Sequence, residues 1–325
     1  MSGTTGAGGP TGTDGTTGTA GIRLIQSVGT GALEWLHAHR DGFGLEPDVN
    51  PETGFLDRFK PVGELAVICK VLFREGVAGS RHAALARQLL DHAWRDVLDG
   101  GRMLVRGQRI ESLSPIPFEV YLPFRELGYE HPELDRLIRL NHRLGSWQAA
   151  ELLPARRLCL SAFERRYGLT PTMPEDEAAR RTWLAHTPEP WTVDTRTGYD
   201  ITHTVFHLTD WGENPAGLPP DIARYLDLWL PAWLDDWTDL ERWDLLGELL
   251  VVDACLTRPT LDAATWEAFA AAQQPDGAMP AIGGMPEGDP EEVFDIVYHS
   301  TLVAAFASVL ATSRAFTALV DGAPS

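Results

Sequence analysis

Most of the chain has the hydrophobic spacing of packed helices. Apolar residues recur at steps of three and four, Pro and Gly clusters interrupt them, and alternating strand patterns are scarce. The pattern predicts helices over 22–40, 60–75, 82–98, 115–127, 132–145, 156–168, 176–188, 199–211, 220–237, 240–256, 262–273 and 293–312. The predicted fold class is therefore all-α.

The predicted helices form pairs in which the second member is the more apolar. The stretch "RHAALARQLLDHAWRDVL" is amphipathic and charged, whereas second members such as "LLGELLVVDACL" and "FDIVYHSTLVAAFASVL" are mostly apolar. Six such hairpins favour a closed ring, in which apolar helices line a barrel and half-polar helices face water. We expect an (α/α)6 barrel, or toroid, forming one domain over residues 22–325. An open array of the same hairpins is the alternative.

The N-terminal segment differs from the rest of the chain in its composition. Residues 1–21, "MSGTTGAGGPTGTDGTTGTAG", are rich in Gly and Thr and lack the basic start and apolar core of a signal peptide. We expect a disordered tail, because such a segment has little apolar surface to bury. The three cysteines (Cys69, Cys159 and Cys255) are too few for a disulfide framework and indicate a reducing, cytoplasmic setting.

The charge balance excludes some partners. The formal net charge is −19 and there is no basic run, which argues against nucleic acid or an anionic membrane. No uninterrupted apolar run reaches the length of a membrane span. Lys occurs only at Lys60 and Lys70, while Arg and Ala are abundant, which is typical of a GC-rich bacterial genome. We expect a small-molecule or peptide substrate; the sequence leaves the oligomeric state open.

Polar residues near the starts of the apolar helices are candidates for a pocket. In a closed barrel of this kind, the N-termini of the inner helices and the loops before them build the pocket at one mouth. The candidates are Glu64, Glu119, Tyr199, Asp200, His203, Glu248, Asp253, Cys255, Asp295, Tyr298 and His299.

Three of these residues have the chemistry of zinc ligands. Asp253 and Cys255 lie two apart in "VVDACL", and His299 lies in "VYHSTL", early in the next apolar helix. Zinc takes carboxylate, thiolate and imidazole ligands, and a catalytic site keeps three of them and one open position. The sequence therefore predicts a Zn²⁺ site at these residues. The alternative is that Cys255 packs in the core and Asp253 caps a turn or pairs with Arg258.

The same region resembles a known family. "VVDACL", followed by "QQPDGAMPAIGGMPEGDPEEVFDIVYHSTL", is similar to the zinc-site region of protein prenyltransferase β subunits, which are α/α toroids. These carry a Val-Asp-x-Cys segment, a Gln- and Gly-containing loop, an acidic linker and a Tyr-His-Thr helix. The resemblance implies zinc bound by Asp253, Cys255 and His299. "QQPDGAMP" also looks like the repeat of triterpene cyclases, without its Trp.

The departures from that family concern the diphosphate. The positions at which the family holds it with Arg and Lys are Gly247 and Leu250, and the Tyr after the Cys is Leu256. A diphosphate needs several cationic or amide donors. The resemblance thus implies a metal site without the diphosphate clamp. A prenyltransferase or terpene cyclase stays open as an alternative, with basic residues supplied from elsewhere, namely Arg156, Arg157 or Arg196.

A second feature is "GYDITHTVFHLTDWG" at 198–212. His203 and His207 are four apart and share a helix face. Because His titrates near neutral pH, His203 is a candidate general acid–base or fourth metal ligand, and His207 a candidate ligand. Tyr199 and Asp200 are candidates to orient His203 or to bind substrate. Candidate substrate contacts are Trp211, Tyr298 and Glu119.

The expected function is a zinc-dependent enzyme on an α/α toroid. The metal would lower the pKa of a substrate thiol or water, and His203 would transfer the proton. Bacterial natural-product biosynthesis is one setting for such chemistry; lanthionine cyclases use zinc on a toroid, but their ligand set of two Cys and one His is absent. Two alternatives remain open: a glycoside-processing enzyme that uses Glu119, Asp200 or Glu248, and a non-enzymatic scaffold with a structural metal.

Overall fold

The computed structural model describes residues 14–45, 57–77 and 79–321, and helix is the only regular secondary structure in these ranges. The α-helices are α1 (Asp14–Ala38), α2 (Lys60–Glu75), α3 (Ser80–His92), α4 (Arg102–Ile110), α5 (Ile116–Glu126), α6 (Pro132–His142), α7 (Gly145–Gln148), α8 (Pro154–Tyr167), α9 (Glu175–Arg180), α10 (Thr195–Leu208), α11 (Pro220–Asp239), α12 (Trp243–Cys255), α13 (Ala263–Ala272) and α14 (Pro290–Asp321). Short 3₁₀ and π turns join several of them. The all-α prediction is confirmed.

Every predicted range overlaps a helix, and two helices were not predicted. These are α4 and α7, which are too short to repeat the 3.6-residue pattern on which the prediction rests. In α4 the apolar residues are Met103, Leu104, Val105 and Ile110, and only Leu104 and Val105 of these are buried, among exposed arginines.

The N-terminal helix begins earlier than expected. α1 starts at Asp14, so residues 14–21 of the predicted disordered tail are helical, while residues 1–13 lie outside the described residues. The first buried residue is Ile22, and residues 18–20 are exposed. Extending an existing helix adds a hydrogen bond per residue without a new nucleus. The part of α1 that packs against α14 therefore supports the continuation of the helix through the exposed residues 18–20.

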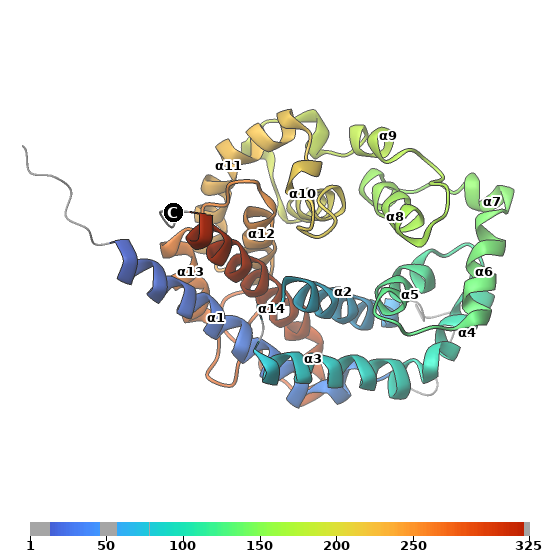
Figure 1. The fold of residues 1–325 in the computed structure, drawn as a ribbon, viewed down its shortest axis with the longest axis horizontal. Coiled ribbons are helices and arrows are strands. Elements are labelled where there is room, and N and C mark those ends of the chain that lie inside the picture. The colour runs from blue at the N-terminus through green and yellow to red at the C-terminus, as the bar shows by residue number, and fades with distance from the viewer. Residues whose placement is uncertain (1–13, 46–56, 78, 322–325) are drawn as a thin grey trace, which may run out of the picture.

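Six apolar helices contact one another in chain order. α2 contacts α5, α5 contacts α8, α8 contacts α10, α10 contacts α12, α12 contacts α14, and α14 contacts α2. Figure 1 shows these helices toward the middle of the molecule, with α1, α3, α6, α9, α11 and α13 around them. The helices predicted to be the more apolar members of the pairs are thus the inner ones.

Helix α12 is enclosed by its neighbours, and a glycine sets how closely one of them approaches. A Cβ added to Gly247 would lie 2.7 Å from Cγ1 of Val303 on α14, too close for any side chain. Leu250 is also buried in the core. The two positions that carry diphosphate-binding cations in the prenyltransferases are therefore packing positions here.

Helix α14 is long and apolar. Over 290–320 it has the length and composition of a membrane span, and it is the one such helix among the described residues. In its most apolar window, 67% is buried inside the molecule, and it contacts α1, α2 and α12. A core helix passes the same test, so this finding is weak evidence, and the expected absence of a membrane span stays a prediction.

Candidate functional site

A cavity of about 360 Å³ lies among α2, α5, α8 and α10. It is lined by Lys60, Gly63, Glu64, Val67, Ile116, Glu119, Val120, Arg156, Cys159, Phe163, His203, His207 and Trp211. A concave site with apolar walls and a few convergent polar groups is typical of small-molecule binding.

His299 of α14 lies between two carboxylates beside this cavity. Its Nδ1 is 3.3 Å from Oε2 of Glu64 on α2, and its Nε2 is 3.4 Å from Oε1 of Glu248 on α12. Carboxylate oxygens only accept hydrogen bonds, so the ring satisfies both of them as an imidazolium. The three side chains connect α2, α12 and α14 through one charged cluster.

The charges in this cluster stabilise one another. Burial alone would lower the pKa of His299, but the Glu64 and Glu248 carboxylates outweigh it and raise that pKa to about 10. Burial alone would raise the pKa of both carboxyl groups, and the neighbouring histidines outweigh it and lower both. At neutral pH, His299 is therefore a cation held between two ionised glutamates.

Glu248 has further partners on α10. The Thr202 hydroxyl donates a hydrogen bond to Oε2 of Glu248, and the same oxygen lies 3.7 Å from Nδ1 of His203. The Glu248 side chain is only 3% exposed. It acts as a fixed negative charge behind His203.

His203 presents one free ring nitrogen. Its Nδ1 is 2.9 Å from the backbone carbonyl oxygen of Tyr199, which can only accept. In the neutral ring, Nδ1 therefore carries the hydrogen and Nε2 carries the lone pair. The side chain is 42% exposed and lines the cavity, so Nε2 is available to a bound molecule.

The two predicted partners of His203 differ in position. Tyr199 contributes its carbonyl group, while its hydroxyl donates to Oδ2 of Asp244 at 2.5 Å; burial and this carboxylate raise the pKa of the phenol. Asp200 does not line the cavity, and its backbone carbonyl accepts a hydrogen bond from Thr204. Of these two residues, Tyr199 is the one that orients His203, and the Thr202 hydroxyl lies 3.3 Å from the same Nδ1.

The cavity floor is aromatic. His207 is buried, burial lowers its pKa so that the ring is neutral, and its centroid lies 5.7 Å from that of Trp211 in an edge-to-face contact. Phe163 contacts the other side of His207 at 6.1 Å between centroids. His207 and Trp211 thus lie at the cavity, as a neutral ring pair.

Glu119 and Tyr298, the other two predicted substrate contacts, are not free to bind a substrate in this cavity. Glu119 lines the cavity, but both of its carboxylate oxygens accept hydrogen bonds from Nη2 of Arg156, at 2.8 and 2.6 Å. Tyr298 does not line the cavity; it stacks on Phe294 with centroids 5.6 Å apart.

Asp253 and Cys255 lie away from His299 and have partners of their own. The Asp253 carboxylate accepts backbone N–H groups of Thr260 at 2.9 Å and Leu261 at 2.8 Å, and burial raises its pKa. The Cys255 sulfur packs beside Gly212, and burial raises the pKa of the thiol to about 11.

This arrangement does not fit the predicted zinc ligands. The Asp253 carboxylate accepts hydrogen bonds from two backbone amides, the Cys255 sulfur packs beside Gly212, and both nitrogens of His299 face carboxylates. Within the described ranges, no group of three or more His, Cys, Asp or Glu side chains could hold a metal ion. Zinc binding itself stays a prediction.

Sequence reasoning placed Glu64 and Glu248 near a barrel mouth but missed their shared partner. The signal was a repeated tripeptide: Gly-Glu-Leu occurs at 63–65 and again at 247–249. In both helices the glycine meets a neighbouring helix closely, Gly63 against Val120 and Gly247 against Val303. In both, the glutamate turns to His299.

Fold and site together define an all-α protein with a cavity among its apolar helices that has apolar walls and a few polar groups. The family model described as "Domain of unknown function (DUF6895)" matches residues 29–309, and the chain belongs to this family. The comparisons with curated proteins and with solved structures give no match. The matched region contains the cavity and the whole His299 cluster.

Proposed function

We propose that the chain is an enzyme that transfers a proton to or from a small molecule in the 360 Å³ cavity, with His203 as the general base. The observation that supports this most is the 2.9 Å contact between Nδ1 of His203 and the carbonyl oxygen of Tyr199. It fixes the tautomer that leaves Nε2 free toward the cavity. Positioned imidazoles of this kind contribute about 10²- to 10⁴-fold to proton-transfer rates.

The cluster behind His203 supplies the electrostatics. When Nε2 accepts a proton, positive charge develops on the ring, and Oε2 of Glu248 lies 3.7 Å from Nδ1. His203, His299 and the Thr202 hydroxyl lower the pKa of Glu248 against the effect of burial, so this negative charge is in place before the reaction. His299 and Glu248 are therefore positioning residues, and His203 is the catalytic residue.

The order of helix contacts supports the finer fold assignment, an (α/α)6 toroid. Six inner helices that contact one another in order, with α14 returning to α2, are what a closed ring requires and an open array lacks. In such a ring, the cavity among α2, α5, α8 and α10 belongs to the inner helices, where ligand sites of helix bundles are built.

The cavity suits an uncharged substrate with an apolar body. Lys60 lies 3.5 Å from Oε1 of Glu64, and Arg156 is paired with Glu119, so both cations that line the cavity already have a carboxylate partner. Phe163 and Trp211 offer aromatic surface to the apolar part. This favours a neutral substrate over an isoprenoid diphosphate.

A base elimination tests the proposal without knowledge of the natural substrate. The probe is 5-nitrobenzisoxazole: a base removes the proton at C3, the C–H electron pair forms the nitrile, the N–O bond breaks, and a coloured nitrophenolate is released. We expect saturable release by the wild-type protein. His203→Gln should lower the rate at least tenfold, because it removes the free nitrogen.

The matched control is His37→Gln, which changes a histidine that bonds to Gln88 away from the cavity. It should keep the wild-type rate. Long-range ¹H–¹⁵N NMR of the histidine rings should show His203 protonated at Nδ1. Unsaturable release, or equal rates in both variants, would overturn the proposal.

A further inference from the structure

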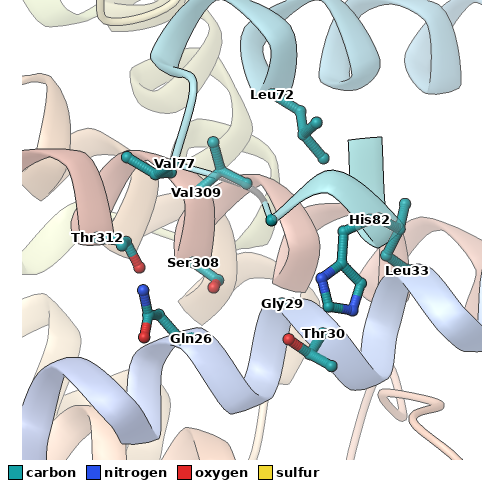
Figure 2. Close-up of a pocket in the computed structure, with 11 residues that line it drawn as sticks. Gln26, Gly29, Thr30, Leu33, Leu72, Val77, His82, Ser308, Val309 and Thr312 are labelled. Carbon is teal, nitrogen blue, oxygen red and sulfur yellow. The ribbon is translucent and has the colours of Figure 1, made fainter. Parts of the chain in front are cut away.

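A second cavity, of about 240 Å³, lies between α1, α14 and the start of α3, and it shares no lining residue with the His203 cavity. Figure 2 shows its side chains. Its walls are apolar at Leu33, Leu72, Val77 and Val309.

Close packing of two helices forms one side of this cavity. A Cβ added to Gly29 on α1 would lie 2.3 Å from Oγ of Ser308 on α14, so the backbone of α1 approaches that side chain directly. The Ser308 hydroxyl is already used, because it donates to the carbonyl oxygen of Ile25 at 2.7 Å. This side is therefore rigid and offers no free hydroxyl.

Thr312 is different from Ser308. Its side chain is 2% exposed, it lines the cavity, and within the described residues its hydroxyl has no hydrogen-bond partner. Figure 2 shows this hydroxyl and the Gln26 amide turned toward each other across one end of the cavity. A buried hydroxyl without a partner is unfavourable, so a ligand that bonds to it would be bound with little competition from the protein.

The other polar groups that line this cavity are hydrogen-bond donors and acceptors. Gln26 and Thr30 come from α1 and His82 from α3, and no Asp, Glu, Lys or Arg of the described chain lines this cavity. The nearby Glu34 carboxylate lies 3.8 Å from Nε2 of His82. An amide and two hydroxyls can each donate and accept, which matches a ligand edge that does both.

We propose that this cavity binds an uncharged small molecule with an amide-type edge and an apolar body. The edge meets Gln26 and Thr312, and the body lies against Leu72 and Val309. A charged group would be desolvated here, and no Asp, Glu, Lys or Arg among the described residues lines the cavity to offset that cost.

The test compares three probes of similar shape by ligand-observed NMR titration of the full chain: benzamide, benzoate and benzylammonium. We expect benzamide to bind at least tenfold more tightly than either ion. Thr312→Val keeps the shape and removes the hydroxyl, and Gln26→Leu removes the amide; each should weaken benzamide at least tenfold. Without ligand, Thr312→Val should be as stable as the wild type or more stable, because it removes an unpaired hydroxyl.

The matched control is Thr238→Val on α11, whose hydroxyl donates to the Leu234 carbonyl and lies outside both cavities. It should leave benzamide affinity unchanged. Equal affinity for the three probes, or benzamide affinity that survives both cavity variants, would overturn the proposal and leave water as the occupant.

Discussion

Glu248 and Asp253 lie little more than one turn apart on α12, and both are buried, yet the pKa values of their carboxyl groups shift in opposite directions. Glu248 faces the imidazoles of His299 and His203 and the Thr202 hydroxyl, and its pKa is lowered. Asp253 faces two backbone N–H groups, and its pKa is raised because they do not offset burial. A buried carboxylate is thus no sign of a metal by itself, since its partners decide its role.

The chemical role of each end of α12 depends on the groups that its carboxylate contacts. Imidazoles can gain and lose protons, so the Glu248 end can support acid–base chemistry. Backbone amides cannot, so the Asp253 end fixes the chain between α12 and α13. Substitutions at each end of α12 test whether the two carboxylates have these different roles.

The largest effect is expected at the Glu248 end. His299→Ala leaves the buried Glu248 and the partly exposed Glu64 without their shared cation, and removing one partner of a buried charged group costs about 3–5 kcal/mol. Urea unfolding monitored by circular dichroism measures the loss. Adding Glu248→Gln to His299→Ala should recover part of it. A loss below about 1 kcal/mol, the value of an exposed ion pair, would contradict the cluster.

The same cluster predicts how stability depends on pH. His299 has a folded pKa of about 10 against an ordinary value of 6.5, so its contribution is complete below pH 6.5 and is lost as pH rises toward 10. The free energy of unfolding of the wild type should therefore fall by a few kcal/mol over that window, relative to His299→Gln. On the acid side, the lowered pKa values of Glu64 and Glu248 contribute stability above pH 4.5 that is lost as pH falls through the folded values.

Much of the fold follows from local pattern, and the site follows from it only in part. Apolar spacing marks the inner helices, and the candidates His203, His207 and Trp211, which come from one short stretch of sequence, line one cavity in the structure. The pairing of His299 with Glu64 and Glu248 depends on which helices become neighbours, which no local pattern encodes. That contact appears only once α2, α12 and α14 are packed together.

The zinc prediction was drawn from ligand types, and the helix geometry works against it. Residues two apart on an α-helix point about 200° away from each other, and α12 stays helical through Cys255. Asp253 and Cys255 therefore turn to different neighbours, the loop at Thr260 and the backbone at Gly212.

A smaller effect is expected at the Asp253 end. Asp253→Asn keeps one acceptor oxygen for two backbone N–H groups, so one of them loses its partner, at about 1–3 kcal/mol. Urea unfolding measures the cost, and hydrogen exchange should become faster at Thr260 or Leu261. The matched control is Asp227→Asn on α11, which lines one surface cavity together with Asp253 and whose carboxylate lies 3.9 Å from the exposed Arg258; it should change stability by less than about 0.5 kcal/mol. Equal effects at the two positions would show that the amide contacts add nothing.

The smallest effect is expected at Cys255. Its thiol is buried beside Gly212, and burial raises the pKa of the thiol to about 11, so it packs there as a small apolar group. Cys255→Ala should lower stability by about 1 kcal/mol, as for a small core truncation, and leave the zinc content per chain unchanged by elemental mass spectrometry. The zinc content of His299→Ala is measured in the same way, because His299 is the predicted zinc ligand that lies on the neighbouring helix α14. If both variants lost about one zinc per chain, the Cys255 end would be a metal site and the contrast along α12 would fail. If the zinc content is the same in the wild type and both variants, Cys255 is a packing residue, and the chemistry of this helix lies at Glu248.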